Sequence, residues 1–138
     1  MKSRETLIRL RKFDVDEKRQ KVAAIEAMIN DFKAMADDLD NQVKSEQQRA
    51  GVDDVNHYAY PTFAKAAVQR RDNLMISIAD LEAKMEAANE ELQDAMKALK
   101  NVEILEERDM ARSQVKAARN EQNALDEFAQ NMSRLAGR

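Results

Sequence analysis

Hydrophobic side chains recur every seven residues in two long segments of the chain. The first segment has two such columns, which comprise Ile8, Val15, Val22, Ile29, Ala36 and Val43 in one and Ile25, Phe32 and Leu39 in the other. The second segment also has two, which comprise Leu74, Leu81, Ala88, Ala95 and Val102 in one and Ile78, Met85, Leu92 and Leu99 in the other. Two columns that persist over several heptads are typical of a coiled coil, and the seven-residue period requires a left-handed supercoil.

The residues that interrupt helices lie between these two segments. Gly51 and Pro61 bracket a short stretch, and the only other glycine, Gly137, is next to the C-terminus. Glycine is favoured just past the end of a helix, whereas proline suits the first turn of the next one. We therefore predict a first helix over about 3–49, with Ser3 as its N-cap.

The rest of the architecture follows from the same boundaries. A connection over about 50–61 leads to a second helix over about 62–135. We predict an all-α fold: a long two-helix antiparallel coiled-coil hairpin forming one domain, residues 1–138, in which the second helix is longer and has a C-terminal overhang.

The unequal lengths of the two helices are the main functional clue. At 1.5 Å per residue the first helix is about 70 Å long and the second about 110 Å. In an antiparallel pair the start of the first helix lies opposite about Arg108 of the second helix. The interval Glu106–Gln114 interrupts the apolar columns at the same place. Residues 109–135 keep a helical apolar spacing, at Val115, Ala118, Leu125, Phe128, Met132 and Leu135. An amphipathic helix without an intramolecular partner indicates that another chain covers it.

Composition excludes several classes of protein. With two glycines, one proline and 4% aromatic residues, the chain lacks the turn residues that sheet folds need. It contains no cysteine, which excludes disulfides, thiolate metal sites and a cysteine nucleophile. Its net charge of −3 provides no general attraction for nucleic acid. No signal-peptide core and no apolar run of about 18 residues is present, so we expect a soluble intracellular protein.

The candidate chemical groups are sparse. His57 is the only histidine, and we interpret it as a loop residue without a metal-binding role. The acidic runs 37–40, 90–91 and 106–107 are expected to be solvated on helix faces, because two helices offer little of the concavity that shifts a pKa. We therefore expect no catalysis, no metal and no cofactor.

Three groups of residues leave alternatives open. Met28 and Met35 flank an apolar column and either pack in the core or contact a partner. The aromatic residues of the bend, Tyr58, Tyr60 and Phe63, either fold back onto Val52 and Val55 or form an exposed tip. The basic cluster 9–21 is a solvated face, a loosely paired helix end, or a surface held by an acidic partner. It lacks the interleaved aromatic residues that stack nucleic-acid bases.

The C-terminal half carries a resemblance to a known family. The runs 102–108 (VEILEER) and 119–129 (RNEQNALDEFA) resemble the C-terminal signature of the flagellar export protein FliJ family. The N-terminal segment is similar to the start of that family, and residues 58–74 resemble its alphaproteobacterial branch. The resemblance spans essentially the whole chain, and its specific part is Glu121-Gln122 with 125–127. Asp109-Met110 departs from the pattern, which usually has a further basic residue there.

The resemblance implies a cytoplasmic, non-enzymatic stalk and adaptor of the flagellar type III export apparatus, peripheral at the inner face of the membrane. The family's coiled coil is similar to the central stalk of rotary ATPases, and its implied partners are the export ATPase ring, the cytoplasmic domain of the export gate and substrate-escort chaperones. We expect the ring to contact Arg108, Val115, Glu121, Gln122, Leu125, Asp126, Glu127 and Phe128. We expect the gate or the chaperones to contact Met28, Met35, Tyr58, Tyr60 and Phe63. The alternatives are a self-assembling structural coiled coil and a nucleic-acid-binding regulator.

Overall fold

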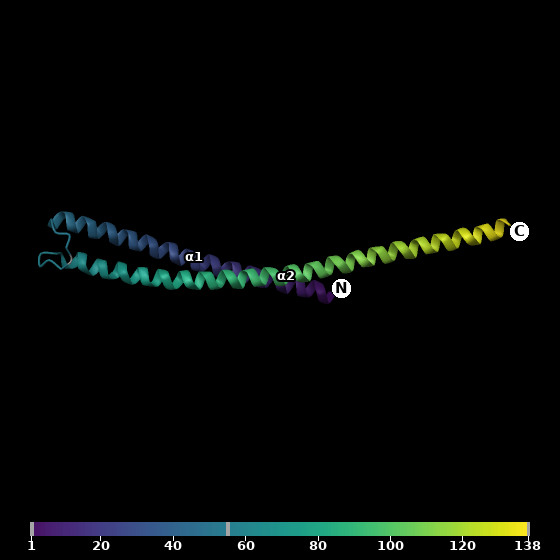
Figure 1. Cartoon of the computed structure of the whole chain (residues 1–138), viewed down its shortest axis with the longest axis horizontal. Coiled ribbons are helices and arrows are strands. Elements are labelled where there is room, and N and C mark those ends of the chain that lie inside the picture. Colours follow the sequence, from purple (N-terminus) through teal and green to yellow (C-terminus); the bar gives the residue numbers. More distant parts are fainter. Residues whose placement is uncertain (1, 55, 138) are drawn as a thin grey trace. The chain divides into compact units, whose positions relative to one another are not determined.

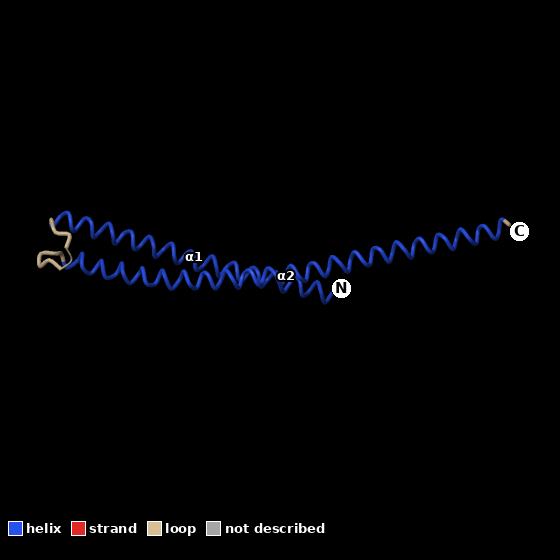
Figure 2. The backbone as a smooth tube through the Cα atoms, viewed as in Figure 1, coloured by secondary structure: helices blue, strands red, loops and turns tan. Residues whose placement is uncertain are grey.

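The computed structural model describes residues 2–54 and 56–137. Within them the chain forms two α-helices, α1 (Lys2–Ala50) and α2 (Thr62–Ala136), and no strand (Figures 1 and 2). The predicted all-α fold with a longer second helix is confirmed, and the predicted boundaries agree within two residues. The expectation for Ser3 is wrong: the chain is already helical at Lys2, so Ser3 lies inside α1 and does not cap it.

The bend begins where a glycine ends α1. Gly51 has φ of +70°, a left-handed conformation that side chains with a Cβ rarely adopt. Its N–H donates to the carbonyl of Gln47 at 2.8 Å, which closes the last turn of the helix. At the far side, the carbonyl of Pro61 accepts a hydrogen bond from the N–H of Lys65 at 3.1 Å, so proline leads into the first turn of α2.

The chain divides into two compact units, which we describe separately. The hairpin unit comprises residues 13–95. Its core contains Ile29 from α1 with Ile78 and Leu81 from α2, and the half-buried residues Ile25, Phe32 and Met85 pack against them. All six belong to the seven-residue columns, so the predicted seam is the core of this unit.

Ion pairs at the edges of the seam join the two helices of the hairpin unit. The nitrogen-to-oxygen distances are 3.1 Å for Lys21–Glu91, 3.8 Å for Lys33–Glu82 and 2.8 Å for Arg71–Asp40. In each later pair along α1 the partner comes earlier along α2, which fixes an antiparallel arrangement. Each exposed pair of this kind contributes about 0.2–1 kcal/mol.

The terminal unit comprises residues up to 12 together with those from 96 onward. Val102 of α2 is buried here, whereas Ile8, Leu99 and Ile104 are half-buried. Every described residue from 111 to 137 is exposed. Within this unit α2 therefore continues without a partner past the first turns of α1 (Figure 1).

Candidate partner-binding surfaces

The overhang, residues 111–136 of α2, presents large apolar side chains to solvent. Val115, Leu125, Phe128, Met132 and Leu135 are between 53% and 69% exposed. A contiguous row of exposed apolar residues on a helix is a feature of interaction sites. The overhang is therefore the first candidate surface.

The apolar stripe of the overhang is not a continuation of the hairpin seam. When the two seam columns that end at Leu99 and Val102 are extended by sevens, they reach only polar residues: Glu106, Asp109, Ser113, Lys116, Asn120, Asn123, Glu127 and Gln130. The stripe instead follows two other columns, which comprise Ala111, Ala118, Leu125 and Met132 in one and Val115, Gln122, Ala129 and Ala136 in the other. The overhang thus presents its apolar residues on a different face from the one that α1 covers.

The residues expected to contact the ring lie in the overhang or, for Arg108, just before it, but they do not share one face. Val115, Gln122 and Leu125 lie on the stripe, and Phe128 lies at its edge. Glu127 is two positions after Leu125, which places it about 200° around the helix from the stripe. All are exposed, as are Arg108, Glu121 and Asp126.

One polar contact within the overhang joins two of these residues. The side-chain amide Nε2 of Gln122 donates to Oδ1 of Asp126 at 3.1 Å, one helical turn apart. This contact orients the Asp126 carboxylate along the edge of the stripe and leaves its second oxygen available.

A basic ridge runs beside the start of the stripe, and the sequence analysis missed it. Arg108, Arg112, Lys116 and Arg119 follow one another at spacings of four, four and three, which places them on one side of the helix. All four are exposed, and Arg112, Lys116 and Arg119 line a shallow hollow together with Ala111 and Val115. The spacing alone was the signal that could have revealed the ridge.

Acidic residues of α2 hold the N-terminal end of α1. Arg4 donates a hydrogen bond to the carboxylate of Asp109 and lies 3.5 Å from Glu106. This hydrogen bond raises the pKa of Arg4 and lowers the pKa of Asp109 below its ordinary value, and the charge of Arg112 lowers it further. Asp109 thus has a structural role as the partner of Arg4.

One residue of each acidic run pairs with a basic side chain, whereas Asp37, Asp38, Glu90 and Glu107 are exposed, as expected. Asp40 pairs with Arg71, Glu91 pairs with Lys21, and Glu106 lies against Arg4. The pKa of Arg71 is raised, chiefly by its hydrogen bond to Asp40 and then by the one to Asp72. Sequence spacing could not reveal these pairs, because each joins residues more than thirty positions apart.

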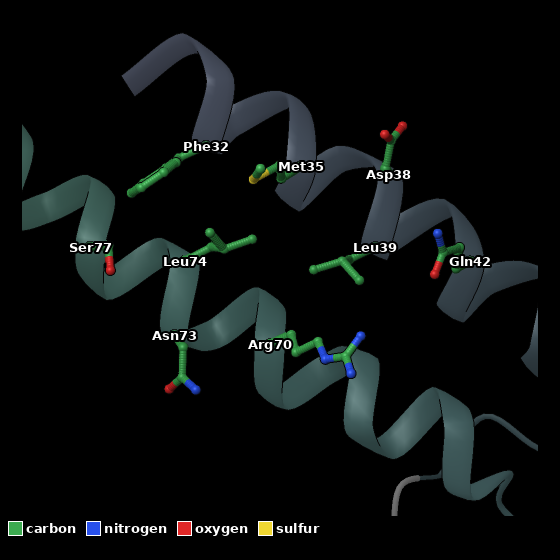
Figure 3. Close-up of a pocket in the computed structure, with 9 residues that line it drawn as sticks. All are labelled: Phe32, Met35, Asp38, Leu39, Gln42, Arg70, Asn73, Leu74 and Ser77. Carbon is green, nitrogen blue, oxygen red and sulfur yellow. The ribbon is translucent and has the colours of Figure 1, made fainter. Parts of the chain in front are cut away.

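A groove between the helices of the hairpin unit is the second candidate surface. It has a volume of about 510 Å³. Figure 3 shows Phe32, Leu39 and Leu74 directed into the space between the two helices, with Met35 beside them. Polar residues form its rim: Asp38, Gln42, Arg70, Asn73 and Ser77. Met28 lies seven residues before Met35 on the same side of α1, and both are about half exposed.

The aromatic residues of the bend face in two directions. Tyr60 is buried, and its hydroxyl accepts a hydrogen bond from Nε2 of Gln47 at 3.0 Å. Tyr58 is 96% exposed and stacks on the ring of His57, and Phe63 is also exposed. Tyr60 is therefore buried whereas Tyr58 and Phe63 are exposed, and Val55, one of the two residues expected to pack against the aromatic residues, lies outside the described residues.

His57 has a local structural contact. Its Nδ1 accepts a hydrogen bond from the N–H of Ala59 at 3.1 Å, which helps to shape the turn before Tyr60. In the part of the chain that the structure describes, no three histidine, aspartate or glutamate side chains gather closely enough to hold a metal ion. None of the helices in that part has a stretch with the length and apolar character that crossing a bilayer requires.

Comparison with known proteins adds one finding. A family model described as "Flagellar FliJ protein" matches residues 1–138. Comparisons with curated proteins and with solved structures gave no match.

Proposed function

Because the chain belongs to the flagellar FliJ protein family, and is thereby a component of the flagellar export apparatus, we propose that it serves there as a stalk and adaptor. The family is a structural one rather than a family of enzymes. In this role the protein promotes assembly of the export ATPase and links it to the export gate and to substrate-escort chaperones. It works in the cytoplasm, peripheral to the inner face of the membrane through its partners.

The observation that carries this proposal is the exposed overhang. A stalk inside a ring needs a helical segment whose side chains are free to contact the surrounding subunits. Every described residue from 111 to 137 meets that requirement, and the stripe offers apolar contacts beside a basic ridge. In the proposal the ring contacts Arg108, Val115, Glu121, Gln122, Leu125, Asp126, Glu127 and Phe128.

The groove and the bend are proposed to serve the other partners. Met35 lines an open groove with an apolar floor and a polar rim, a combination that suits an inserted side chain or short helix. Tyr58 and Phe63 add exposed aromatic area at the bend. Tyr60 differs from its neighbours, because its burial makes it a packing residue rather than part of the exposed surface.

Truncation after Met110 tests the ring contact. The shortened chain keeps Glu106 and Asp109, and therefore keeps both acidic partners of Arg4. We expect it to remain a helical hairpin by circular dichroism and to lose binding to the export ATPase in size-exclusion chromatography. If the truncated chain bound the ATPase as well as the intact one, the ring contact would lie elsewhere.

A pair of matched variants sharpens this test. Leu125→Glu and Asn123→Glu each add one negative charge to the overhang, but only Leu125 lies on the stripe. We expect at least about a tenfold loss of ATPase affinity for Leu125→Glu, because a charge then replaces a buried apolar contact. Asn123→Glu should bind as the unmodified chain does; equal losses for both would indicate a contact set by charge alone.

The groove requires a separate experiment. Met35→Glu introduces a charge into the groove wall, and Met75→Glu places the same charge at an equally exposed methionine that does not line it. We expect only Met35→Glu to lose capture of the gate's cytoplasmic domain or of a chaperone, and both to retain the ATPase. Retained capture by Met35→Glu would remove the groove from the proposal.

A further inference from the structure

We propose that the overhang, when no other protein covers it, pairs with the overhang of a second copy of this chain. The two helices run antiparallel, and residue 111 of one lies opposite residue 136 of the other. The proposal concerns the free protein, so it stands or falls independently of the contact with the export ATPase.

The stripe has the geometry that such a pair requires. Its two columns alternate at spacings of four and three, as the a and d positions of a coiled coil do. In an antiparallel pair the residues of one column lie beside those of the other column on the partner. The two-fold axis of the dimer passes between residues 123 and 124. Each layer of the interface then contains one residue from each chain, and the symmetry repeats every layer once. The layers are Val115 with Met132, Ala118 with Ala129, Gln122 with Leu125, and Ala111 with Ala136.

Together the layers extend over the whole exposed segment, from residue 111 to residue 136. Two of the four consist of alanine alone, which allows the helix backbones to approach closely, and the others contain the larger apolar residues. Because the stripe lies on a different face from the hairpin seam, α1 does not have to move for the pair to form.

The charges at the edges of the stripe select this register. One edge carries Arg112, Arg119, Asp126 and Ser133. In the proposed register Arg119 of each chain lies beside Asp126 of the other, so opposite charges meet on both sides of the axis. Asp126 uses one carboxylate oxygen for Gln122 and keeps lone pairs for an arginine of the second copy.

The neighbouring arrangements each bring like charges together. If one helix slides along the other by seven residues so that the overlap moves toward residue 111, Arg119 of one chain lies against Arg119 of the other, and Glu121 against Glu121. If it slides by seven residues in the opposite direction, Asp126 of one chain lies against Asp126 of the other. A parallel pair places Glu121 of one chain beside Asp126 of the other. Like charges in contact are destabilising, so among these the overlap of 111 with 136 is favoured.

Self-complementarity favours a second copy over an unrelated occupant. An acidic partner would complement the basic ridge at the start of the overhang but would meet Asp126 further along. A second, antiparallel copy reverses the order of these charges and brings Arg119 beside Asp126 on both sides of the axis. The layers contain few large side chains, so we expect a weak, reversible dimer that a larger apolar partner surface displaces.

Cross-linking tests the orientation, because the chain has no cysteine of its own. We would prepare Ala118→Cys and Ala129→Cys as separate full-length proteins and oxidise them alone and mixed. The mixture should form a disulfide between the two variants. Ala118→Cys alone should not form one, because the two copies of residue 118 are about 16 Å apart along the antiparallel pair. Equally efficient cross-linking of Ala118→Cys with itself would overturn the antiparallel register.

Charge exchange tests the same register by sedimentation velocity of the full chain over a concentration series. Arg119→Asp and Asp126→Arg should each raise the dimer Kd about tenfold, and the double variant should restore it, because the two charges are simply exchanged. Arg134→Asp is the control, since it makes the same charge change about 200° around the helix from the stripe and should leave the Kd unaltered. A monomer at every concentration, or a double variant as weak as the single ones, would overturn the proposal.

Discussion

Two stretches of α2 have similar helical character but different surroundings. Residues 64–102 bury Ala64, Ile78, Leu81 and Ala88 among others, whereas residues 111–136 bury none. Both contain regularly spaced apolar residues, and both are uninterrupted helix. Both stretches are therefore helical, but only residues 64–102 are packed against another helix.

The composition of the overhang explains how it remains helical without a partner. It contains no glycine or proline, and six alanines, three arginines and three glutamines, which have high helix propensity, make up nearly half of it. It also extends a helix that is already formed, so it does not bear the unfavourable nucleation step. Propensity alone gives a helix of marginal stability, and tertiary packing normally supplies the remainder.

The first prediction concerns amide hydrogen exchange along α2. We expect amides near Ile78 and Leu81 to be protected at least about a thousandfold more than those near Leu125, because the former open only with the core whereas the latter open by local fraying. Mass spectrometry of peptic fragments would measure the difference. Equal protection in the two stretches of the isolated monomer would show that the overhang has a partner within its own chain.

The second prediction compares one core and one overhang truncation. Ile78→Ala removes a side chain that is 3% exposed and should lower the free energy of unfolding by about 2–4 kcal/mol. Leu125→Ala removes a side chain that is mostly exposed and should change it by less than about 0.5 kcal/mol. Urea denaturation followed by circular dichroism would measure both. A large decrease in the free energy of unfolding for Leu125→Ala in dilute solution would show that the overhang is packed as the hairpin core is, and would contradict the prediction.

The comparison also shows what the sequence can predict. The seven-residue columns were sufficient to identify the hairpin core, since Ile29, Ile78 and Leu81 all lie on them. Gly51 and Pro61 marked the bend because their backbone preferences are local. Such features depend on neighbouring residues or on one repeat, and both can be read along the chain.

Features that depend on the register between the helices could not be predicted. The contact of Arg4 with Asp109 requires knowledge of which residues of α1 and α2 lie opposite each other. The opposite directions of Tyr58 and Tyr60 depend on the irregular path of the bend, where no periodicity applies. The groove beside Met35 depends on how Phe32 and Leu74 fill the space between the helices.

The third prediction concerns the two glycines, one in each unit. Gly51→Ala should destabilise the hairpin by about 1–2 kcal/mol, because alanine in the left-handed conformation is strained even though the space around Gly51 is open. Gly137→Ala lies beyond the last residue of α2, so its effect on unfolding should be negligible. Thermal melts of the two variants and of the unmodified chain would check this. If Gly51→Ala melted at the same temperature as Gly137→Ala, Gly51 would not be the residue whose left-handed conformation ends α1.

The fourth prediction has the smallest expected effect and concerns acid. The pKa of Asp109 is lowered in the folded state, chiefly by the hydrogen bond from Arg4, so its ionised form is favoured there. The resulting stabilisation is complete above the ordinary pKa of aspartate, about 3.9, and is lost as the pH falls through the lowered folded value. Asp109→Asn removes the ion pair at every pH, whereas Asp126→Asn leaves it intact.

Amide exchange in the first turns of α1 would measure this effect, after correction for intrinsic rates. At pH 6 we expect Asp109→Asn to exchange faster than the unmodified chain and Asp126→Asn to match it. At pH 2 the difference should narrow, because acid protonates Asp109 in the unmodified chain. If Asp109→Asn already matched the unmodified chain at pH 6, the contact of Arg4 with Asp109 would contribute nothing to holding the start of α1, and the paired part of α2 would end before Asp109.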